Sequence, residues 1–111
     1  MRPRLNVRLV LETGERQADG FGGFRTIWRE IGVLWAGMAA GPGRERSGEV
    51  AAESVLPWRI TVRAATVGDP RRPVAGQRFR LGERVFRIEA VAEADASGRW
   101  LVCVAREEER A

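Results

Sequence analysis

The chain has 111 residues, a length that fits one domain with a single hydrophobic core. All 19 basic residues are Arg, against 15 acidic residues, so the net charge is +4 and an anionic partner is favoured, either nucleic acid or an acidic protein surface. His, Lys and Tyr are absent, which leaves no nucleophile and base to pair, so we do not expect an enzyme.

A single cysteine, Cys103, excludes a disulfide within the chain and any metal site built from several cysteines. It lies in the apolar run 101–104, which favours a buried, unreactive thiol. We therefore expect no metal and no cofactor. The first residues lead into an alternating segment rather than an unbroken apolar stretch, so we expect neither a signal peptide nor a membrane-spanning helix, and a protein made in the cytoplasm.

Two alternating segments open the chain. Residues 5–12 carry apolar side chains at every second position, the period of a half-buried strand, and the glycine-rich stretch 14–23 predicts a turn region. From Phe24 to Met38 the alternation resumes but slips near Gly32. A long strand with a bulge or sharp bend there explains the slip, because one extra residue exchanges the two faces.

The next segment, 39–56, changes character. Gly41-Pro42-Gly43 breaks the strand, and residues 44–54 are polar with several Ala and Glu. Such a segment predicts at most two or three turns of helix, with too few apolar positions to be buried deeply. We expect a short helix or loop inserted between two strands.

The second half of the chain alternates again. In strand 57–63, Trp58, Ile60 and Val62 share one face. A proline-containing loop follows, and Gly82-Glu83 has the spacing of a two-residue type II′ hairpin turn. The predicted elements are the strand 57–63, the loop 67–76, the hairpin strands 77–81 and 84–92, the last strand 100–105, and a charged tail, 106–111, that frays.

Together these elements predict an all-β fold. It is a small antiparallel β-barrel or sandwich of about six strands, with one short helix inserted after the second strand, and residues 1–111 form one domain. The four Trp residues have two interpretations. They can fill the core or a subunit interface, which Trp28, Trp58 and Trp100 favour because they are in register with apolar neighbours, or they can stack on nucleic-acid bases.

The charges are unevenly distributed along the chain. Eight Arg lie between residues 57 and 87, whereas acidic residues dominate from residue 88 onward. A molecule with one basic and one acidic side can pair head to tail with its own copies, which is how a heterologous ring closes. The alternative is an ordinary solvated surface of mixed charge.

Several short motifs of the chain are specific in combination: the Gly-Gly turn, the Thr-x-Trp strand and the Ile-Thr-Val-Arg strand. The segments concerned are spread over nearly the whole chain: Leu5 to Glu12, Asp19-Gly20, Gly22-Gly23, Phe24 to Trp28, Val33 to Ala36, Gly43 to Arg46, Trp58 to Arg63, Gly76 to Phe79, and Val85 to Val91. Together they resemble the head-tail joining proteins of tailed phages, of the head-closure (stopper) or adaptor type. The Ala, Arg and Gly bias is similar to that of versions from gene transfer agents, which are phage-derived particles.

The resemblance implies a structural protein that forms a ring in the particle neck, joins the DNA-filled head to the tail and helps to close the DNA channel. Its implied partners are other copies of itself, six or twelve in number, an adaptor or portal-side protein, a tail terminator or tail-tube protein, and packaged double-stranded DNA contacted without sequence specificity. A membrane is not among them. The particle would be assembled in the bacterial cytoplasm.

Two sets of residues are candidates for these contacts. The insert after the second strand can line or narrow the channel in such proteins, which makes Arg44, Glu45 and Arg46 candidates there. Arginines on the later strands can bind phosphates through counterion release or contact a neighbouring subunit; these are Arg59, Arg63, Arg78 and Arg80. The alternative function from another class is a free nucleic-acid-binding β-barrel.

Overall fold

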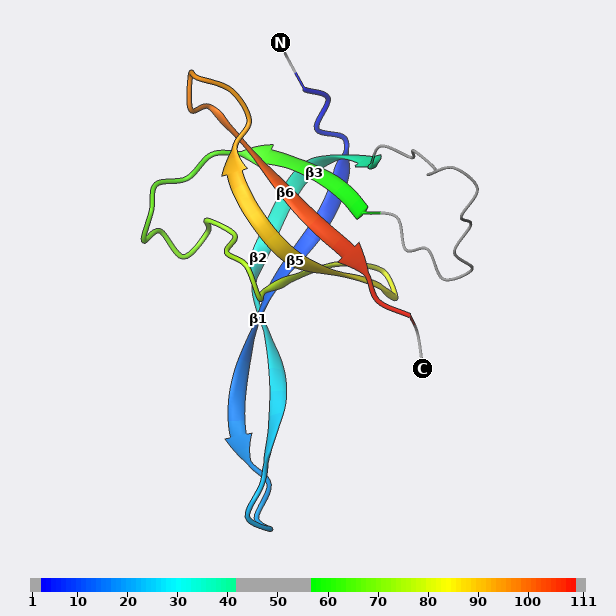
Figure 1. Ribbon diagram of the computed structural model, residues 1–111, viewed down its shortest axis with the longest axis vertical. Helices are drawn as coiled ribbons and strands as arrows, with labels where there is room; N and C mark the ends of the chain where they lie inside the picture. Colours follow the sequence, from blue (N-terminus) through cyan, green and yellow to red (C-terminus); the bar gives the residue numbers. More distant parts are fainter. Residues whose placement is uncertain (1–2, 42–56, 110–111) are drawn as a thin grey trace, which may run out of the picture.

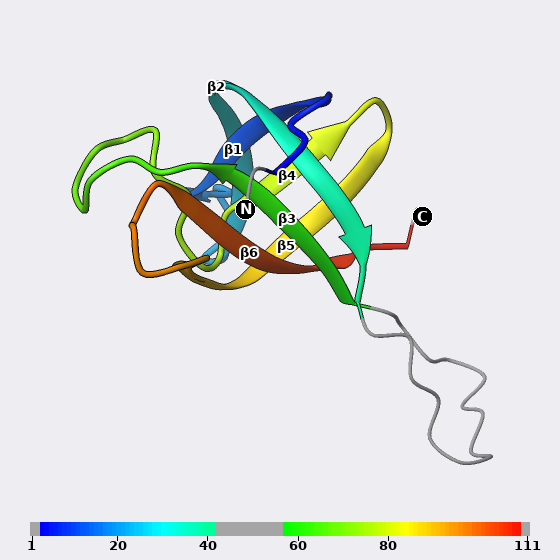
Figure 2. The same ribbon diagram turned by 90° about the horizontal axis from the view of Figure 1, so that it is seen from above.

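The computed structural model describes residues 3–41 and 57–109, which form one closed antiparallel β-barrel (Figures 1 and 2). Around the barrel the strands follow the order β1-β2-β3-β6-β5-β4, and β4 returns to β1. The predicted all-β antiparallel fold of about six strands is confirmed. The strands are β1 (Val7–Ala18), β2 (Phe24–Ala40), β3 (Pro57–Arg63), β4 (Arg78–Leu81), β5 (Arg84–Glu93) and β6 (Trp100–Glu107).

The core is built from the alternate residues that each strand turns inward. On β3 these are Ile60 and Val62, as their spacing predicted. Cys103 is buried among them, and burial raises the pKa of its thiol to about 12, which keeps it protonated and unreactive. The buried apolar set is Leu9, Leu11, Ala36, Ile60, Val62, Phe79, Phe86, Ile88, Leu101, Cys103 and Ala105.

A bulge interrupts β2 where the alternation of the sequence slips. Leu11 of β1 pairs with Gly32, but the next residue, Glu12, pairs with Glu30. Ile31 is therefore the extra residue, and the bulge predicted near Gly32 is confirmed. The bulge exchanges the two faces of β2. After the bulge, Leu34 points toward the core, whereas the part of β2 before the bulge lies outside the barrel.

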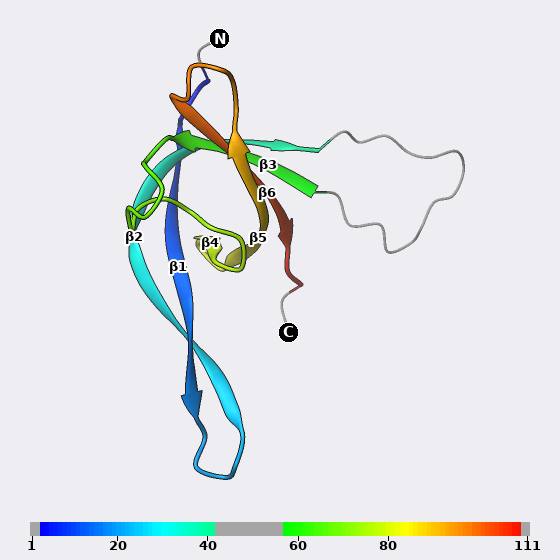
Figure 3. The ribbon, with the colours of Figure 1, turned by 60° about the vertical axis from the view of Figure 1, so that its left-hand side comes forward.

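β1 and β2 continue past the barrel as a two-stranded projection, which we call the arm and define as residues 13–29 (Figures 1 and 3). β4 pairs with β1 only at Val10, Leu11 and Glu12, so the arm has no third strand. The prediction of a turn over 14–23 was therefore too long. β1 runs to Ala18 because Gly14 leaves room for the Trp28 side chain, whose nearest atom would lie 3.2 Å from an added Cβ.

The turn itself spans only the tip of the arm. Asp19 Oδ1 accepts hydrogen bonds from the backbone N–H groups of Phe21 (2.7 Å) and Gly23 (3.0 Å). Gly20 and Gly22 both adopt φ of 85°, a conformation that disfavours other residues. The hydrogen bonds from Phe21 and Gly23 lower the pKa of Asp19, so this carboxylate stays charged.

The segment that was expected to hold a helix lies almost wholly outside the described residues, which resume at Pro57. Its first two residues, 39 and 40, belong to β2, because they pair with β3 at Arg59 and Trp58. The strand ends at Ala40, and the N–H of the next residue, Gly41, donates to the carbonyl oxygen of Pro57. The expected insert therefore starts two residues later than predicted.

The charged tail is also shorter than predicted. β6 extends to Glu107, and the N–H of Glu108 donates to the carbonyl oxygen of Val85 at 2.8 Å. Ion pairs from Arg84 to Glu107 and from Arg87 to Glu108 fasten this end to β5. Only residues 110 and 111 fall outside the described part of the chain at this end.

The connections in the second half follow the predicted turn chemistry. Gly82 has φ of 62°, and none of the described non-glycine residues has positive φ, so the Gly82-Glu83 turn fits type II′ rather than type I′.

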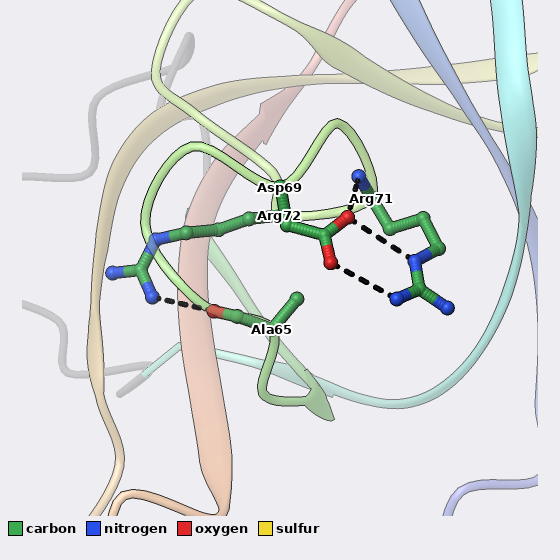
Figure 4. Close-up of polar contacts among 4 residues, drawn as sticks. All are labelled: Ala65, Asp69, Arg71 and Arg72. Atoms are coloured by element: carbon green, nitrogen blue, oxygen red, sulfur yellow. Dashed lines mark hydrogen bonds and ion pairs between the residues drawn. The ribbon is translucent and has the colours of Figure 1, made fainter.

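The loop between β3 and β4 is held by its own contacts (Figure 4). Within it Asp69 accepts two hydrogen bonds from the Arg71 guanidinium, which lowers the pKa of Asp69 to about 2, and Arg72 donates to the Ala65 carbonyl oxygen at 2.9 Å. Within 3–41 and 57–109, no helix is long and apolar enough to cross a membrane.

Replacing a fully buried ring should cost far more stability than replacing an exposed one. Phe79→Ala leaves a cavity in the barrel and should lower the free energy of unfolding by about 3–5 kcal/mol. Phe21→Ala, at the tip of the arm and 92% exposed, is the matched control and should change it by less than about 0.5 kcal/mol. Urea unfolding monitored by Trp fluorescence measures both, and equal losses would contradict this assignment of the core.

Candidate functional site

A cluster of charged side chains lies outside the barrel at the base of the arm. Glu12 of β1 is directly opposite Arg78 of β4, which is directly opposite Arg87 of β5. The neighbouring inward residues, Leu11, Phe79 and Phe86, fill the core, so these three charged side chains point outward. They lie where β4 closes the barrel onto β1.

Glu12 is the buried acid of this cluster, with only 6% of its surface exposed. Arg78 Nε donates to its Oε1 at 2.7 Å, and Arg80 Nε donates to its Oε2 at 2.9 Å. Burial raises the pKa of Glu12, but the hydrogen bonds from Arg80 and Arg78 and their positive charges outweigh burial, so the pKa lies below its ordinary value. The Glu12 carboxylate is therefore ionised and binds two arginines of β4, Arg78 and Arg80.

The same arginines hold an aromatic side chain of the arm. The guanidinium carbon of Arg78 lies 4.1 Å from the centroid of the Trp28 ring, and that of Arg87 lies 5.0 Å from it. Each cation–π contact contributes about 1 kcal/mol. Because Trp28 belongs to β2 beyond the bulge, these contacts fasten the base of the arm to β4 and β5.

The predicted contact residues do not form one surface. Arg78 and Arg80 bind Glu12 of their own chain, whereas Arg59 and Arg63 are exposed on β3. Arg59 has no ion pair within the described part of the chain, and Arg63 lies over the Trp100 ring at 5.2 Å. The remaining candidates, Arg44, Glu45 and Arg46, lie outside the described residues.

The uneven charge of the sequence is largely balanced within the chain. Arg84 pairs with Glu107 at 2.8 Å through two hydrogen bonds, which lower the pKa of that acid. Two more pairs, Arg87 with Glu108 and Arg106 with Glu89, are both 3.0 Å long. The acidic end of the chain thus neutralises neighbouring arginines, and the arginines left for a partner lie elsewhere.

The tryptophans divide between the two interpretations left open by the sequence. Trp58 packs against the core and meets Phe86 edge to face at 5.7 Å. Trp35 is 54% exposed, and Trp28 and Trp100 lie partly exposed outside the barrel. The expectation of a core position is confirmed for Trp58 alone.

Sequence reasoning missed a row of alternating Arg and Trp across four strands. Arg8 is directly opposite Trp35, and Arg63 is directly opposite Trp100. Ala36 of β2 pairs with Val62 of β3, and both point inward. Trp35, which precedes Ala36, and Arg63, which follows Val62, are therefore neighbours on the outer face. We call Arg8, Trp35, Arg63 and Trp100 the Arg–Trp row. Its signal is spread over four segments, so it becomes visible only once the strand order is known.

A pocket lies at the Trp100 end of this row. Its walls include Arg63 and Trp100 of the row, Arg99 before β6, and Pro3 and Leu5 of the N-terminal segment. Two arginines and an aromatic ring make this pocket suited to a group that is both apolar and negatively charged. Within the described residues, no cluster of His, Cys, Asp and Glu could hold a metal ion.

The tip of the arm was also missed, because the glycine-rich stretch was read only as a connection. Phe21 is 92% exposed and Phe24 is 61% exposed, with the Arg16 guanidinium 4.2 Å from the Phe24 ring centroid. Exposed phenyl rings on a projecting hairpin are typical of a surface that is covered in an assembly. Two Phe flanking a glycine turn could have signalled this.

Neutralising Glu12 should weaken the closure of the barrel. Glu12→Gln removes the anion between Arg78 and Arg80 and should lower the free energy of unfolding at pH 7 by about 2 kcal/mol. Because the pKa of Glu12 is lower in the folded chain, its contribution is present above the ordinary value of 4.5 and disappears as the pH falls through the lower folded value. Urea unfolding measured from pH 7 to pH 3 should therefore show a smaller decrease in the free energy of unfolding for Glu12→Gln than for the wild type.

The control is Glu15→Gln, which removes an exposed acid that pairs with Arg29 on the arm. It should change stability by less than about 0.5 kcal/mol, since exposed pairs contribute little. If the two variants behave alike, the clustered arginines do not stabilise the closure.

The comparisons with known proteins agree with this architecture. The family model described as phage head completion protein matches residues 1–108. A chain from a structure described as the virion of the native gene transfer agent particle is 55% identical, with 99% of this chain and all of that chain covered and a TM-score of 0.81. No curated protein matches the chain significantly.

A second solved structure supports the fold alone. Protein SF1141 from Shigella flexneri 2a is 23% identical over 97% of this chain and 96% of its own, with a TM-score of 0.68. The family match covers nearly all of the sequence, including both strands of the arm and every strand of the barrel. The chain belongs to the phage head completion protein family.

Proposed function

We propose that this chain is a structural neck protein of a phage or of a gene transfer agent, forming a ring that joins the DNA-filled head to the tail and helps to close the DNA channel. The observation that carries the proposal is the 55% identity, over the full length of both chains, to a chain of a gene transfer agent virion. The protein acts by assembly, without a cofactor and without catalysis. Its partners are its own copies, six or twelve of them, an adaptor or portal-side protein, and a tail terminator or tail-tube protein.

One end of the barrel is the candidate for the channel side. The chain leaves the barrel at Gly41 and returns at Pro57, so the insert with Arg44, Glu45 and Arg46 starts and ends there. Arg59 lies on the same end of β3, pairs with Ala39 in register, and is exposed. An exposed arginine with no carboxylate within the described residues can attract phosphates of packaged DNA without sequence specificity.

Loss of the protein should produce a defect in the particle and not in the host cell. In a strain lacking the gene, negative-stain images should show tailless heads or heads that have lost their DNA, and mass analysis should detect the protein in the necks of wild-type particles. Intact, tailed, DNA-filled particles in its absence would contradict the proposed function. The favoured function would then be that of a free nucleic-acid-binding β-barrel, because the Arg–Trp row has exposed Arg and Trp side chains that could bind nucleic acid.

The channel contact can be tested at Arg59. Particles with Arg59→Gln should retain less nuclease-resistant DNA on warming than wild-type particles, because one phosphate-attracting charge is lost in every subunit. Arg71→Gln is the matched control: it removes the same charge from an exposed side chain in the loop that follows the other end of β3. Equal DNA retention in the two variants would exclude Arg59 as a DNA contact.

A further inference from the structure

The arm and the Arg–Trp row are two exposed surfaces that lack a partner within the described chain. Phe21 and Phe24 project from the tip of the arm, and Trp35 is more than half exposed on the barrel. The arm extends six residues beyond Glu12, about 20 Å at the rise of a β-strand. In Figure 1 the arm points away from the end of the barrel at which the N-terminal segment lies, so a chain cannot bring its own arm to this pocket.

The two surfaces are complementary in chemistry. Asp19 is the only charged residue between Gln17 and Phe24, and the lowered pKa of its carboxyl keeps it negative. The tip thus presents an anion beside Phe21, whereas the Phe24 ring is covered by the guanidinium of Arg16 on β1. The row and its pocket present Arg63 and Arg99 beside indole rings, and the described chain gives neither arginine a carboxylate partner.

We propose that the arm of one copy docks on the Arg–Trp row of the next copy, with Phe21 against the row and its pocket and Asp19 facing the arginines. The contact joins two different surfaces of the same chain, so it is heterologous and repeats from copy to copy until a ring closes. Each phenyl ring that is covered removes on the order of 150–250 Å² from water. This inference rests on the proposed ring and assigns the surfaces that hold it together.

The base of the arm suits this role. Trp28 is held by Arg78 and Arg87, and the Arg78 side chain is fixed in turn by Glu12. An arm that is held at its base loses less conformational freedom on docking than a flexible loop would. The charged cluster around Glu12 therefore fixes the direction of the arm, and the tip of the arm makes the contact.

Cysteine cross-linking in assembled particles tests the contact. The variant Phe21→Cys with Trp35→Cys places one thiol on each proposed surface, and a flexible bis-maleimide should produce a ladder of multimers of this chain. The native Cys103 is buried and does not interfere. The control, Phe21→Cys with Ala90→Cys, places the second thiol on the exposed face of β5, three strands from β2 in the barrel order, and should give no ladder.

Each outcome separates this inference from the proposed function. A ladder for Trp35 and none for Ala90 supports the docking. Neck-located protein with no ladder, or with Phe21 cross-linked to a different protein or to DNA, overturns the docking and leaves the neck function intact. Absence of the wild-type protein from particles overturns the neck function itself. If the Trp35 variant fails to enter particles, Phe21→Cys with Arg99→Cys tests the pocket end of the same surface.

Discussion

The closure of the barrel depends on a short contact between β1 and β4. Val10, Leu11 and Glu12 pair with three of the four residues of β4, so the backbone hydrogen bonds between the two strands are few. Glu12 reinforces this seam from outside by binding Arg78 and Arg80, while Leu11 and Phe79 pack against the core on the inner side. An unpaired buried carboxylate would be costly, whereas this one has a cation on each oxygen. The seam ends at Glu12, and beyond it β1 and β2 continue without a third strand as the arm.

The bulge at Ile31 lets one strand serve two purposes. On one side of it β2 contributes Leu34 and Ala36 to the barrel, and on the other it forms half of the arm. Because the bulge exchanges the faces, Trp28 points toward Arg78 and Arg87 and fastens the arm to the barrel. A regular strand would place an arginine or isoleucine of the arm there instead. The bulge thus lets the same strand pack in the barrel and form the arm, which is the surface proposed for assembly.

Charge pairing within the chain limits what remains for partners. Glu107, Glu108 and Glu89 each bind an arginine of a neighbouring strand, so the contrast between basic and acidic halves of the sequence does not become a contrast between two sides of the molecule. On β3, the arginines without a carboxylate partner in the described chain are Arg59, near the insert, and Arg63, in the Arg–Trp row. They lie toward opposite ends of β3, so the proposed DNA contact and the proposed contact between subunits are on different parts of the barrel.

The sequence by itself determined the six-strand pattern, the bulge near Gly32, the inward face of β3 and the Gly82 turn, because these depend on alternation and on local backbone preferences. It also carried the family resemblance. It did not show that β1 continues to Ala18 and β6 to Glu107. Only the tertiary structure decided that Arg78 and Arg80 face Glu12, about 66 residues earlier in the chain, and that Arg8, Trp35, Arg63 and Trp100 form one row. Such neighbours are set by the order and register of the strands around the barrel, which local patterns do not encode.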